Sequence, residues 1–347
     1  ASLRNDHFSC SQDADDLFFR EMFPSHIDLL STTKLSFQLV VFLGSGSLYQ
    51  DAVAKIDAML KEHGTHKLQL NSYRVAAYYH LYVEDFESVL KTCDRAMEYL
   101  DQHPHLSQRA RYGEFNLQKL STAVFVRRFE DAYQMSDKCI GSFAEAGNNW
   151  YFATDMAFVA AINLRDFQKA ENYYVAATSH RKYNALNVSF KERWTLYGAY
   201  LHLAERLDLY SSKQSRSKPF RLSTYLNSLP AESKSKKVYN VFIIISHVFF
   251  LMLDGDFDLA EKRIEYLRVY SSRYLKEKQL NRVRLFLRLI QSFPKHSFIP
   301  DEIRKNSKAL FHELEATARD PMPSDTNELI PFELMYEALL RSMEKNS

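Results

Sequence analysis

Four carboxylates in the stretch LDGDFDLAEKRIEYL have almost the spacing of a calcium-binding EF-hand loop. Asp254, Asp256 and Asp258 alternate along the chain, and Glu265 stands twelfth counting from Asp254. An EF-hand loop needs glycine at its sixth position, where the backbone turns sharply, and this sequence has Leu259 there. The alternative is structural, with Asp256 capping a helix and Asp258 supplying a favourable first-turn charge. The missing glycine favours the structural role.

Four histidines suggest a second chemistry, zinc binding. His63 and His66 lie in HGTH, and His103 and His105 lie in HPH. A zinc site would need them to converge with tetrahedral geometry, which nothing in their spacing requires. We therefore expect solvated loop histidines and predict no metal ion or other cofactor.

Catalytic motifs are missing from the sequence. It contains no nucleophile elbow, no HExxH and no convincing His/Cys/Asn set. Cys93 and Cys139 are predicted at buried helix positions, where a thiol behaves as a small apolar group. We expect a non-catalytic protein, and a substrate or metal bound among His80, Asp155 or His202 would instead indicate an enzyme.

Composition points to helices as the elements that position these residues. The 347 residues are 46% apolar, yet include only 8 glycines and 9 prolines. Sheets and glycine-rich cofactor loops need more turn residues than that, whereas long helices do not. Three cysteines without a CxxC spacing indicate neither a disulfide framework nor a zinc site, so a cytoplasmic setting is expected.

No membrane segment is predicted. The strongest apolar run, Val241 to Leu253, has 13 residues with Ser246 and His247 in its middle. A membrane-spanning helix needs about 20 residues, so this run is expected to be a fully buried helix. No cleavable signal is visible at the start of the sequence either, and no membrane partner is expected.

One phrase recurs along the chain: an aromatic residue, two variable residues and a small residue, followed by a helical apolar pattern. The aromatic residues are Tyr49, Phe86, Phe129, Phe167 and Phe257, with a weaker copy at Phe220. They are separated by 37, 43, 38, 53 and 37 residues. A helical pattern precedes and follows each phrase, so the unit is predicted to be a helical hairpin whose second helix begins at the aromatic residue.

This pattern resembles the second-helix signature of tetratricopeptide repeats, in a divergent form with a longer period. The resemblance covers about residues 34–270, and Trp194 with Gly198 is similar to the first-helix motif of that family. It implies an all-α fold, a right-handed superhelical array of antiparallel helical hairpins. We expect an N-terminal helical segment at 1–33, repeats at 34–290 and a C-terminal helical cap at 291–347, all in one continuous domain.

Local signals indicate where some of these helices begin and end. Ser189, three residues before Glu192, forms a predicted capping box that opens the helix of Trp194. Gly147 is predicted to end the helix before it as a glycine C-cap.

The resemblance also implies a binding face. Arrays of this kind present a concave groove, lined mainly by first helices, to peptides or partner helices. The outward first-helix positions of the family correspond here to Asn71, Arg74, Tyr78, Tyr82, Asp155 and Asn163. We therefore expect a scaffold that binds a protein or peptide partner; the sequence leaves its oligomeric state open.

Uneven charge supports an alternative function. Residues 211–237 hold seven basic residues against Glu232, and residues 262–288 hold nine basic against two acidic. Such positive stretches could contact nucleic acid, or could be solvated linkers. The candidate basic surface in the first stretch consists of Lys213, Arg216, Lys218, Lys234, Lys236 and Lys237. Base-stacking aromatic residues are not interleaved there, so nucleic acid is the less favoured partner.

Overall fold

The computed structural model describes most of the chain from residue 64 onward. The described residues are 54–55, 58, 60–62, 64–106, 109–213, 220–228, 237–275, 280–317 and 328–346. They form helices, turns and connections, with no strand among them. The predicted segment 1–33 and the repeat phrase at Tyr49 lie outside these ranges.

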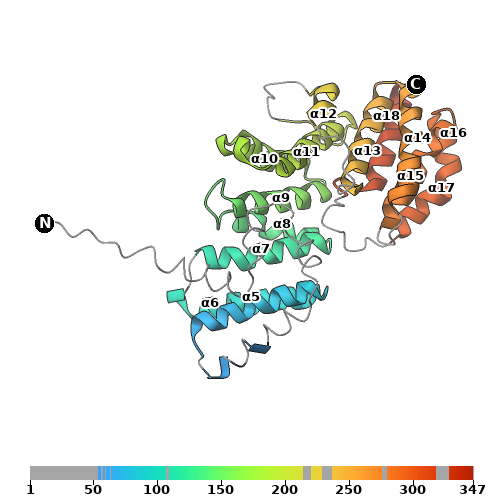
Figure 1. The fold of residues 1–347 in the computed structure, drawn as a ribbon. Helices are drawn as coiled ribbons and strands as arrows, with labels where there is room; N and C mark the ends of the chain where they lie inside the picture. The colour runs from blue at the N-terminus through green and yellow to red at the C-terminus, as the bar shows by residue number, and fades with distance from the viewer. Residues whose placement is uncertain are drawn as a thin grey trace. The chain divides into compact units, whose positions relative to one another are not determined.

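The helices follow one another along the chain (Figure 1), and three residues connect α5 to α6, α7 to α8, α9 to α10 and α13 to α14. In chain order they are α5 (His66–Tyr82), α6 (Phe86–Gln102), η1 (Pro104–Leu106), α7 (Arg109–Phe125), α8 (Phe129–Ile140), α9 (Asn148–Asn163), α10 (Phe167–Ser179), η2 (Arg181–Ala185), α11 (Val188–Arg206), α12 (Leu222–Ser228), α13 (Lys237–Leu253), α14 (Phe257–Tyr274), α15 (Asn281–Ile290), α16 (Ser292–Lys295), α17 (Pro300–Ala316) and α18 (Phe332–Asn346).

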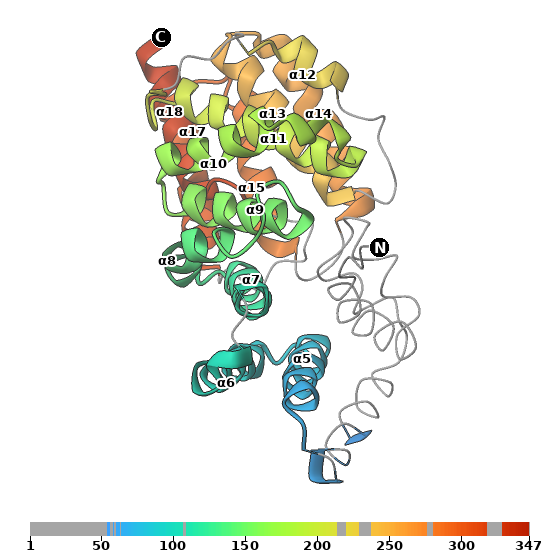
Figure 2. The same cartoon turned by 90° about the vertical axis from the view of Figure 1, so that its left-hand side faces the viewer.

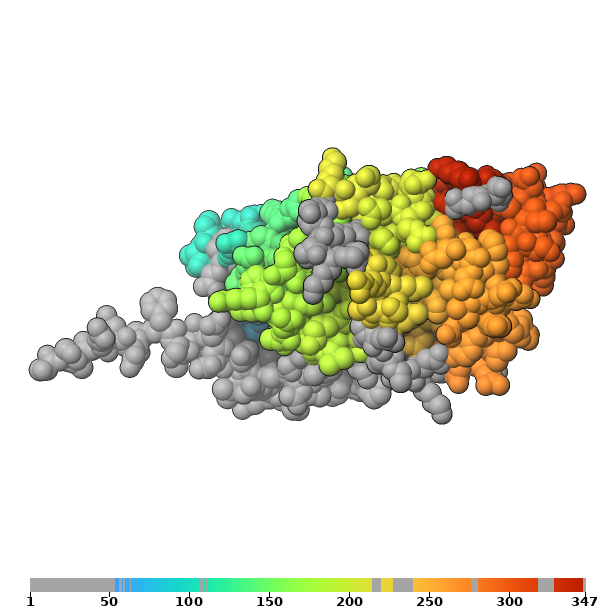
Figure 3. Space-filling view, turned by 90° about the horizontal axis from the view of Figure 1, so that it is seen from above, coloured from blue at the N-terminus to red at the C-terminus, as the bar shows by residue number. Residues whose placement is uncertain are grey.

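Helices that are neighbours in the sequence pack against each other. Each of α5 to α10 contacts the helix before or after it, and α13 packs on α14 in the same way (Figure 2). The helix α11 contacts both α10 and α13, and α18 packs on α13 and α17. In the space-filling view, the atoms of α13 and α14 lie next to those of α17 and α18 (Figure 3). The predicted all-helical fold with packed neighbours is thus confirmed for the described residues.

A related turn, with positive φ at both Ser297 and Phe298, ends the short helix α16, and one common turn ends five of the longer helices. One residue in each turn has a positive φ, between 55° and 76°; these residues are Glu84, Arg127, Arg165, Asp208 and Gly255. They are 43, 38, 43 and 47 positions apart. After Glu84, the amide of Asp85 donates to the carbonyl of His80 at 2.9 Å, the bond that defines a Schellman motif.

The four other turns repeat this bond. The pairs are Arg128 with Ala123, Asp166 with Ala161, Leu209 with Ala204, and Asp256 with Leu251, all between 2.8 and 3.0 Å. The bond satisfies a carbonyl at the helix end, and the positive φ reverses the chain within three residues. The next helix can therefore pack back on the one before it.

The predicted aromatic phrase marks the helix that follows four of these turns. Phe86, Phe129, Phe167 and Phe257 are the first residues of α6, α8, α10 and α14. The small residue three positions later is at most 1% exposed in every case; these residues are Val89, Ala132, Ala170 and Ala260. The prediction that the aromatic residue opens the second helix is confirmed at these positions.

The weak copy at Phe220 was wrongly placed. Tyr210 is the residue that follows the fourth turn as Phe86 follows the first, and its ring stacks on that of Phe167 with centroids 5.4 Å apart. Phe220 lies two residues before α12. No helix starts at Tyr210, and residues 211–213 after it are not helical either. The interval of 53 residues therefore reflects chain inserted after the turn.

Two of the predicted caps were also wrong. Asn187, not Ser189, caps α11, because its side chain accepts a hydrogen bond from the amide of Phe190 at 2.9 Å. Gly147 does not end a helix but precedes α9 as its N-cap residue, and the left-handed residue there is Ala146. Both signals lay near a helix boundary: Ser189 is the second residue of α11, and Gly147 stands at the start of a helix instead of at the end of one.

The interior is rich in aromatic side chains, and at Gly198 two helices approach each other closely. Trp194 is fully buried in α11, and a β-carbon placed on Gly198 would lie 2.5 Å from the Tyr174 hydroxyl. Glycine therefore allows α10 to approach α11 here. Cys93 and Cys139 are fully buried as predicted, and burial raises the pKa of each thiol to about 12.

The apolar run predicted as a buried helix forms α13. Its described side chains from residue 240 onward are mostly buried, including Val241, Ile245 and Val248 at 0% exposure. Among the helices that the structure describes, none combines the length and apolar character needed to cross a bilayer.

Candidate functional site

The predicted partner-binding residues on α5 join a polar network between two first helices. The Arg74 guanidinium donates to the Glu114 carboxylate of α7 at 2.7 and 2.9 Å, and to the Asn71 amide oxygen at 2.9 Å. Arg74 and Glu114 remain 17% and 32% exposed, whereas Asn71 is buried. The network therefore links α5 to α7 and keeps both charges within reach of solvent.

Tyr78 and Tyr82 stand on the same helix as this network. Both are half-buried, and Tyr82 is the last residue of α5. Each presents an aromatic body with a hydroxyl at its tip, a combination common in protein interfaces.

Asp155 occupies in α9 the position that Arg74 occupies in α5. Each stands ten residues before the left-handed residue of its turn, Arg165 or Glu84. Asp155 is fully buried and accepts hydrogen bonds from Arg193 at 2.7 Å and from Tyr197 at 2.5 Å, both in α11. The carboxylate thus holds Arg193, whose side chain is 30% exposed, at the junction of two first helices.

Asn163 is the last residue of α9 and corresponds to Tyr82 of α5. It is 7% exposed, and its side-chain nitrogen donates to the Val159 carbonyl at 2.9 Å. Its amide oxygen is buried and has no hydrogen-bond partner. A buried acceptor without a hydrogen bond costs about 1–3 kcal/mol of folding free energy, so a donor that reached it would be stabilising.

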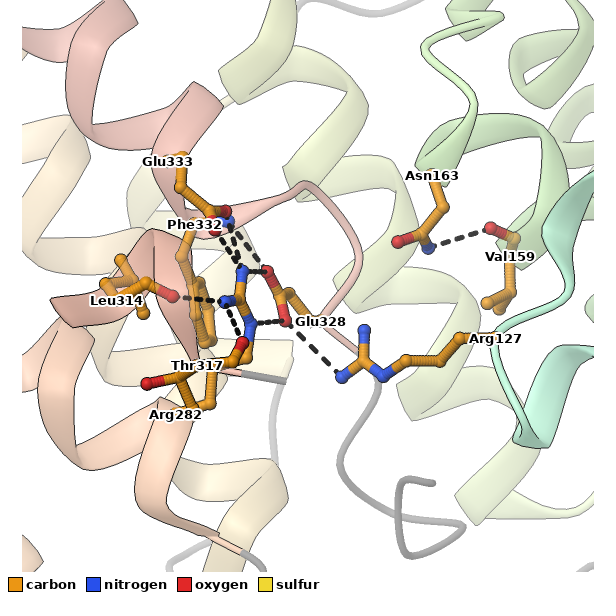
Figure 4. Close-up of polar contacts among 9 residues, drawn as sticks. All are labelled: Arg127, Val159, Asn163, Arg282, Leu314, Thr317, Glu328, Phe332 and Glu333. Carbon is orange, nitrogen blue, oxygen red and sulfur yellow. Dashed lines mark hydrogen bonds and ion pairs between the residues drawn. The ribbon is translucent and has the colours of Figure 1, made fainter. Parts of the chain in front are cut away.

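Figure 4 shows a cluster of buried charges together with Asn163. Arg282 of α15 donates two hydrogen bonds to the Glu328 carboxylate, at 2.9 and 3.0 Å, and one to Glu333 at 2.6 Å. Arg127, in the turn after α7, lies 3.4 Å from the same Glu328 carboxylate across 201 residues of sequence. The side chains of Arg127, Arg282 and Glu328 are 7%, 7% and 1% exposed. We call these three residues with Glu333 the arginine–glutamate cluster.

Electrostatic interactions explain how the charged side chains of this cluster can be buried together. Burial alone would raise the pKa of the Glu328 carboxyl, but the hydrogen bonds and charge of Arg282, together with Arg127, lower it. Arg282 also donates to the carbonyls of Leu314 at 2.8 Å and Thr317 at 3.4 Å. Its donors therefore join α15, the end of α17 and the chain entering α18.

Sequence reasoning missed this cluster. Nothing in the spacing of Arg127, Arg282 and Glu328 connects them, because they belong to three distant helix boundaries. Arg282 was counted within the basic stretch 262–288, yet it is buried against carboxylates. The local sequence, Glu328-Leu-Ile-Pro with Asp325 and Glu333 nearby, carries no motif that would have identified the cluster.

The predicted basic surface is described only in part. Lys213 is exposed, and Lys237 is the first residue of α13. The other members, Arg216, Lys218, Lys234 and Lys236, lie outside the described residues. In the second basic stretch, Arg268 pairs with Glu265 at 2.7 Å on the surface of α14. Nucleic-acid binding through these stretches stays a prediction.

The EF-hand-like carboxylates have structural roles. Asp256 accepts from the amide of Leu259 at 3.2 Å and caps α14, as predicted. Asp254 pairs with Arg206 at 2.8 Å. The sequence pattern thus reflects a capped helix with flanking ion pairs.

Three of the loop histidines lie together. The His66 ring centroid is 4.6 Å from that of His103 and 5.2 Å from that of His105. The Nδ1 atom of His103 is 2.8 Å from the Tyr99 carbonyl oxygen. Even so, no group of three or more His, Cys, Asp or Glu side chains in the described part of the chain is placed to hold a metal ion.

The geometry therefore provides a polar row on first helices, at Arg74–Glu114 and Asp155–Arg193, and a buried cluster that connects distant helix ends. Neither arrangement sets a nucleophile beside a base. No protein-family model, curated protein or solved structure significantly matches this chain.

Proposed function

We propose that this protein is a non-catalytic scaffold that binds an extended peptide or a partner helix on the face formed by its first helices. The observation that carries the proposal is the fivefold recurrence of one Schellman turn at intervals of 38 to 47 residues. A recurring hairpin that packs on its neighbours cannot bury its faces alone, and it builds an extended surface. In this proposal the array is a right-handed superhelix similar to tetratricopeptide repeats.

The polar row supports this choice of face. Arg74 pairs with the next first helix through Glu114, and Asp155 pairs with the next through Arg193. Three of these four charges retain 17% to 32% side-chain exposure, so they can still bind a partner. Charges that are already paired are also held in fixed positions, which lowers the entropy lost on binding.

The half-buried tyrosines supply the apolar part of the interface. Binding energy in protein interfaces is concentrated in a few residues, of which Tyr, Trp and Arg are the most frequent. Tyr78 and Tyr82, one helical turn apart on α5, can hold successive side chains of a bound peptide.

Peptide display against the intact chain tests the proposal. Peptides enriched from a random library are then titrated by fluorescence anisotropy against the wild-type protein and the double variant Tyr78→Ala/Tyr82→Ala. We expect the double variant to bind at least about tenfold more weakly, as for loss of two interface residues. Arg74 is left unchanged because its removal would strand the Glu114 charge.

The matched control is Tyr266→Ala. Tyr266 is 36% exposed on α14, a second helix, so it lies off the proposed face. The affinity of this variant for the selected peptides should stay within about threefold of wild type, since a residue outside the interface contributes little. Equal weakening in both variants, or failure of the library to yield any peptide, would reject the proposed face.

A further inference from the structure

One side of helix α14 carries basic and aromatic side chains but no acidic one. Each of these residues stands three or four positions from another, so they share one side of the helix. They are Lys262, Arg263, Tyr266, Tyr270, Arg273 and Tyr274. We call this set the α14 stripe. It lies within the second basic stretch of the sequence, residues 262–288.

The tyrosines form a row of neighbouring rings along the stripe. The ring centroids of Tyr266 and Tyr270 are 6.2 Å apart, and those of Tyr270 and Tyr274 are 4.7 Å apart. Tyr270 is buried, and its hydroxyl accepts a hydrogen bond from the Asn240 side chain of α13 at 3.3 Å. Tyr266 is 36% exposed. The row is therefore fixed to α13 at its centre and presents the Tyr266 ring to solvent.

The positive charges of the stripe are exposed and have no carboxylate partner in the described part of the chain. They belong to Lys262, Arg263 and Arg273. Glu265 lies on another side of α14 and pairs with Arg268 at 2.7 Å. From Tyr266 to Tyr274 the helix contains no acidic residue at all. The stripe therefore presents net positive charge around an exposed aromatic ring.

The second helices α6 and α8 distribute their charges differently. On α6 the exposed Lys91 and Arg95 are flanked by the exposed Glu87 and Glu98. On α8 the exposed Glu130 stands in the first turn. Among these three helices, only α14 thus separates its basic residues from its carboxylates. Helix α6 in turn offers a control surface with the same basic residue types.

Positive charge on both sides of an exposed ring matches the chemistry of a single-stranded nucleic acid. Lysine and arginine neutralise phosphates, and an aromatic ring stacks on a base whose face is accessible. Along the helix axis Lys262 precedes Tyr266 by about 6 Å and Arg273 follows it by about 10 Å, so phosphates on both sides of a stacked base are within reach. In a duplex the base faces are covered by neighbouring bases. An acidic peptide would pair with the same charges but offers no base to stack on Tyr266.

We propose that the α14 stripe binds single-stranded nucleic acid, with Lys262, Arg263 and Arg273 on its phosphates and Tyr266 stacked on a base. The stripe belongs to a second helix, whereas the proposed peptide face belongs to first helices. The two proposals therefore do not depend on each other. If both hold, one chain brings a protein partner and a nucleic acid together.

Fluorescence anisotropy with labelled probes tests this proposal on the intact chain. The probes are oligouridine and oligothymidine of about 12 nucleotides, a DNA duplex and a polyglutamate peptide. We expect at least one single strand to bind more tightly than both the duplex and polyglutamate, and the tighter single strand identifies RNA or DNA as the preferred ligand. Three phosphate contacts predict that its affinity falls roughly twentyfold between about 50 mM and about 200 mM salt.

Variants of the stripe separate the charge contribution from the stacking contribution. Lys262→Glu/Arg273→Glu should weaken binding of the single strand at least roughly tenfold and should also reduce its salt dependence. Tyr266→Ala should weaken binding at least roughly fivefold but leave the salt dependence unchanged, because no phosphate contact is lost. Tyr266→Phe keeps the aromatic ring and should stay within roughly twofold of wild type.

The matched control is Lys91→Glu/Arg95→Glu on α6, which makes the same change of net charge away from the stripe. Its affinity for the single strand should stay within roughly threefold of wild type. Equal weakening by the two charge-reversal variants would reduce the effect to net charge and would overturn the proposal. So would wild-type affinity in Tyr266→Ala, binding of the duplex or of polyglutamate as tight as that of the single strands, or no binding of either single strand at about 50 mM salt.

Discussion

At the scale of single residues, burial decides what a polar side chain in this molecule can do. Asp155 was predicted as a partner contact, yet its carboxylate is fully enclosed and already accepts from Arg193 and Tyr197. Any contribution to binding must therefore pass through Arg193, the exposed member of the pair. Variants of Asp155 consequently measure stability before they measure recognition.

Removing this carboxylate should destabilise the fold. Asp155→Ala removes the buried acceptor of the hydrogen bonds from Tyr197 and Arg193, at an expected cost of about 2–4 kcal/mol. Urea unfolding followed by circular dichroism measures the loss. Glu265→Ala breaks an exposed pair with Arg268 and should cost under about 1 kcal/mol. A loss as small in Asp155→Ala would contradict the buried network.

His247 should make stability fall in acid. Burial, and then the charge of Arg263, lowers the pKa of its imidazole to about 4, against about 6.5 when unfolded. Between these values the unfolded state binds a proton that the folded state excludes, so stability is complete above pH 6.5 and declines towards pH 4. The maximum loss from this group is about 3 kcal/mol.

The measurement is the free energy of unfolding of wild type and His247→Gln between pH 7.5 and pH 4. We expect the two curves to converge or cross as the pH falls, because the variant lacks the titrating imidazole. A difference between them that does not depend on pH would show that His247 titrates normally in the fold.

At the scale of elements, the Schellman turn explains both what the sequence could reveal and what it could not. The aromatic phrase located the starts of α6, α8, α10 and α14, because the aromatic residue and the small residue pack at every copy. The turn itself has no such signature. Its left-handed residue is glutamate, arginine, aspartate or glycine, and only Gly255 has the residue type that signals this conformation.

The misplacement of the phrase at Phe220 has the same cause. Phe220 matched the pattern by residue type, whereas Tyr210 occupies the place after the turn, with no helix beginning there. The arginine–glutamate cluster was beyond sequence reasoning altogether, because Arg127 and Glu328 meet only through the packing of distant helices. The local sequence pattern was therefore enough to predict the hairpins, whereas the contacts between distant hairpins became visible only in the structure.

Substitutions to and from glycine should reveal the energy stored in these turns. Arg165 is exposed with a φ of 65°, so Arg165→Gly should stabilise the protein by about 0.5–1 kcal/mol. Gly255→Ala should destabilise it by about 1 kcal/mol; no atom lies within 4 Å of the added β-carbon, so the cost is conformational. Thermal unfolding measures both shifts. Arg127→Gly should not stabilise, because it also loses Glu328.

At the scale of the whole molecule, α18 completes the packed group of helices formed by α13 to α17. Phe332 stacks on Phe286 with centroids 4.1 Å apart, and Tyr336 packs on Phe293 and Phe311. Met335, Leu339 and Leu340 are fully buried beside them. This helix therefore covers an apolar surface that α13, α15 and α17 would otherwise expose.

Truncation after residue 317 should consequently unfold one part of the molecule before the other. If each hairpin is stabilised chiefly by its neighbours, loss of α18 weakens α13–α17 and leaves α5–α10 nearly unchanged. Hydrogen exchange should rise by at least roughly tenfold in α13–α17, and by less than roughly threefold in α6 and α8. The Arg127–Glu328 contact predicts one exception, since its loss should affect the turn after α7. Uniform exposure of all helices would instead mean that the chain unfolds as a single cooperative unit, and the nearest-neighbour arrangement of hairpins would be wrong.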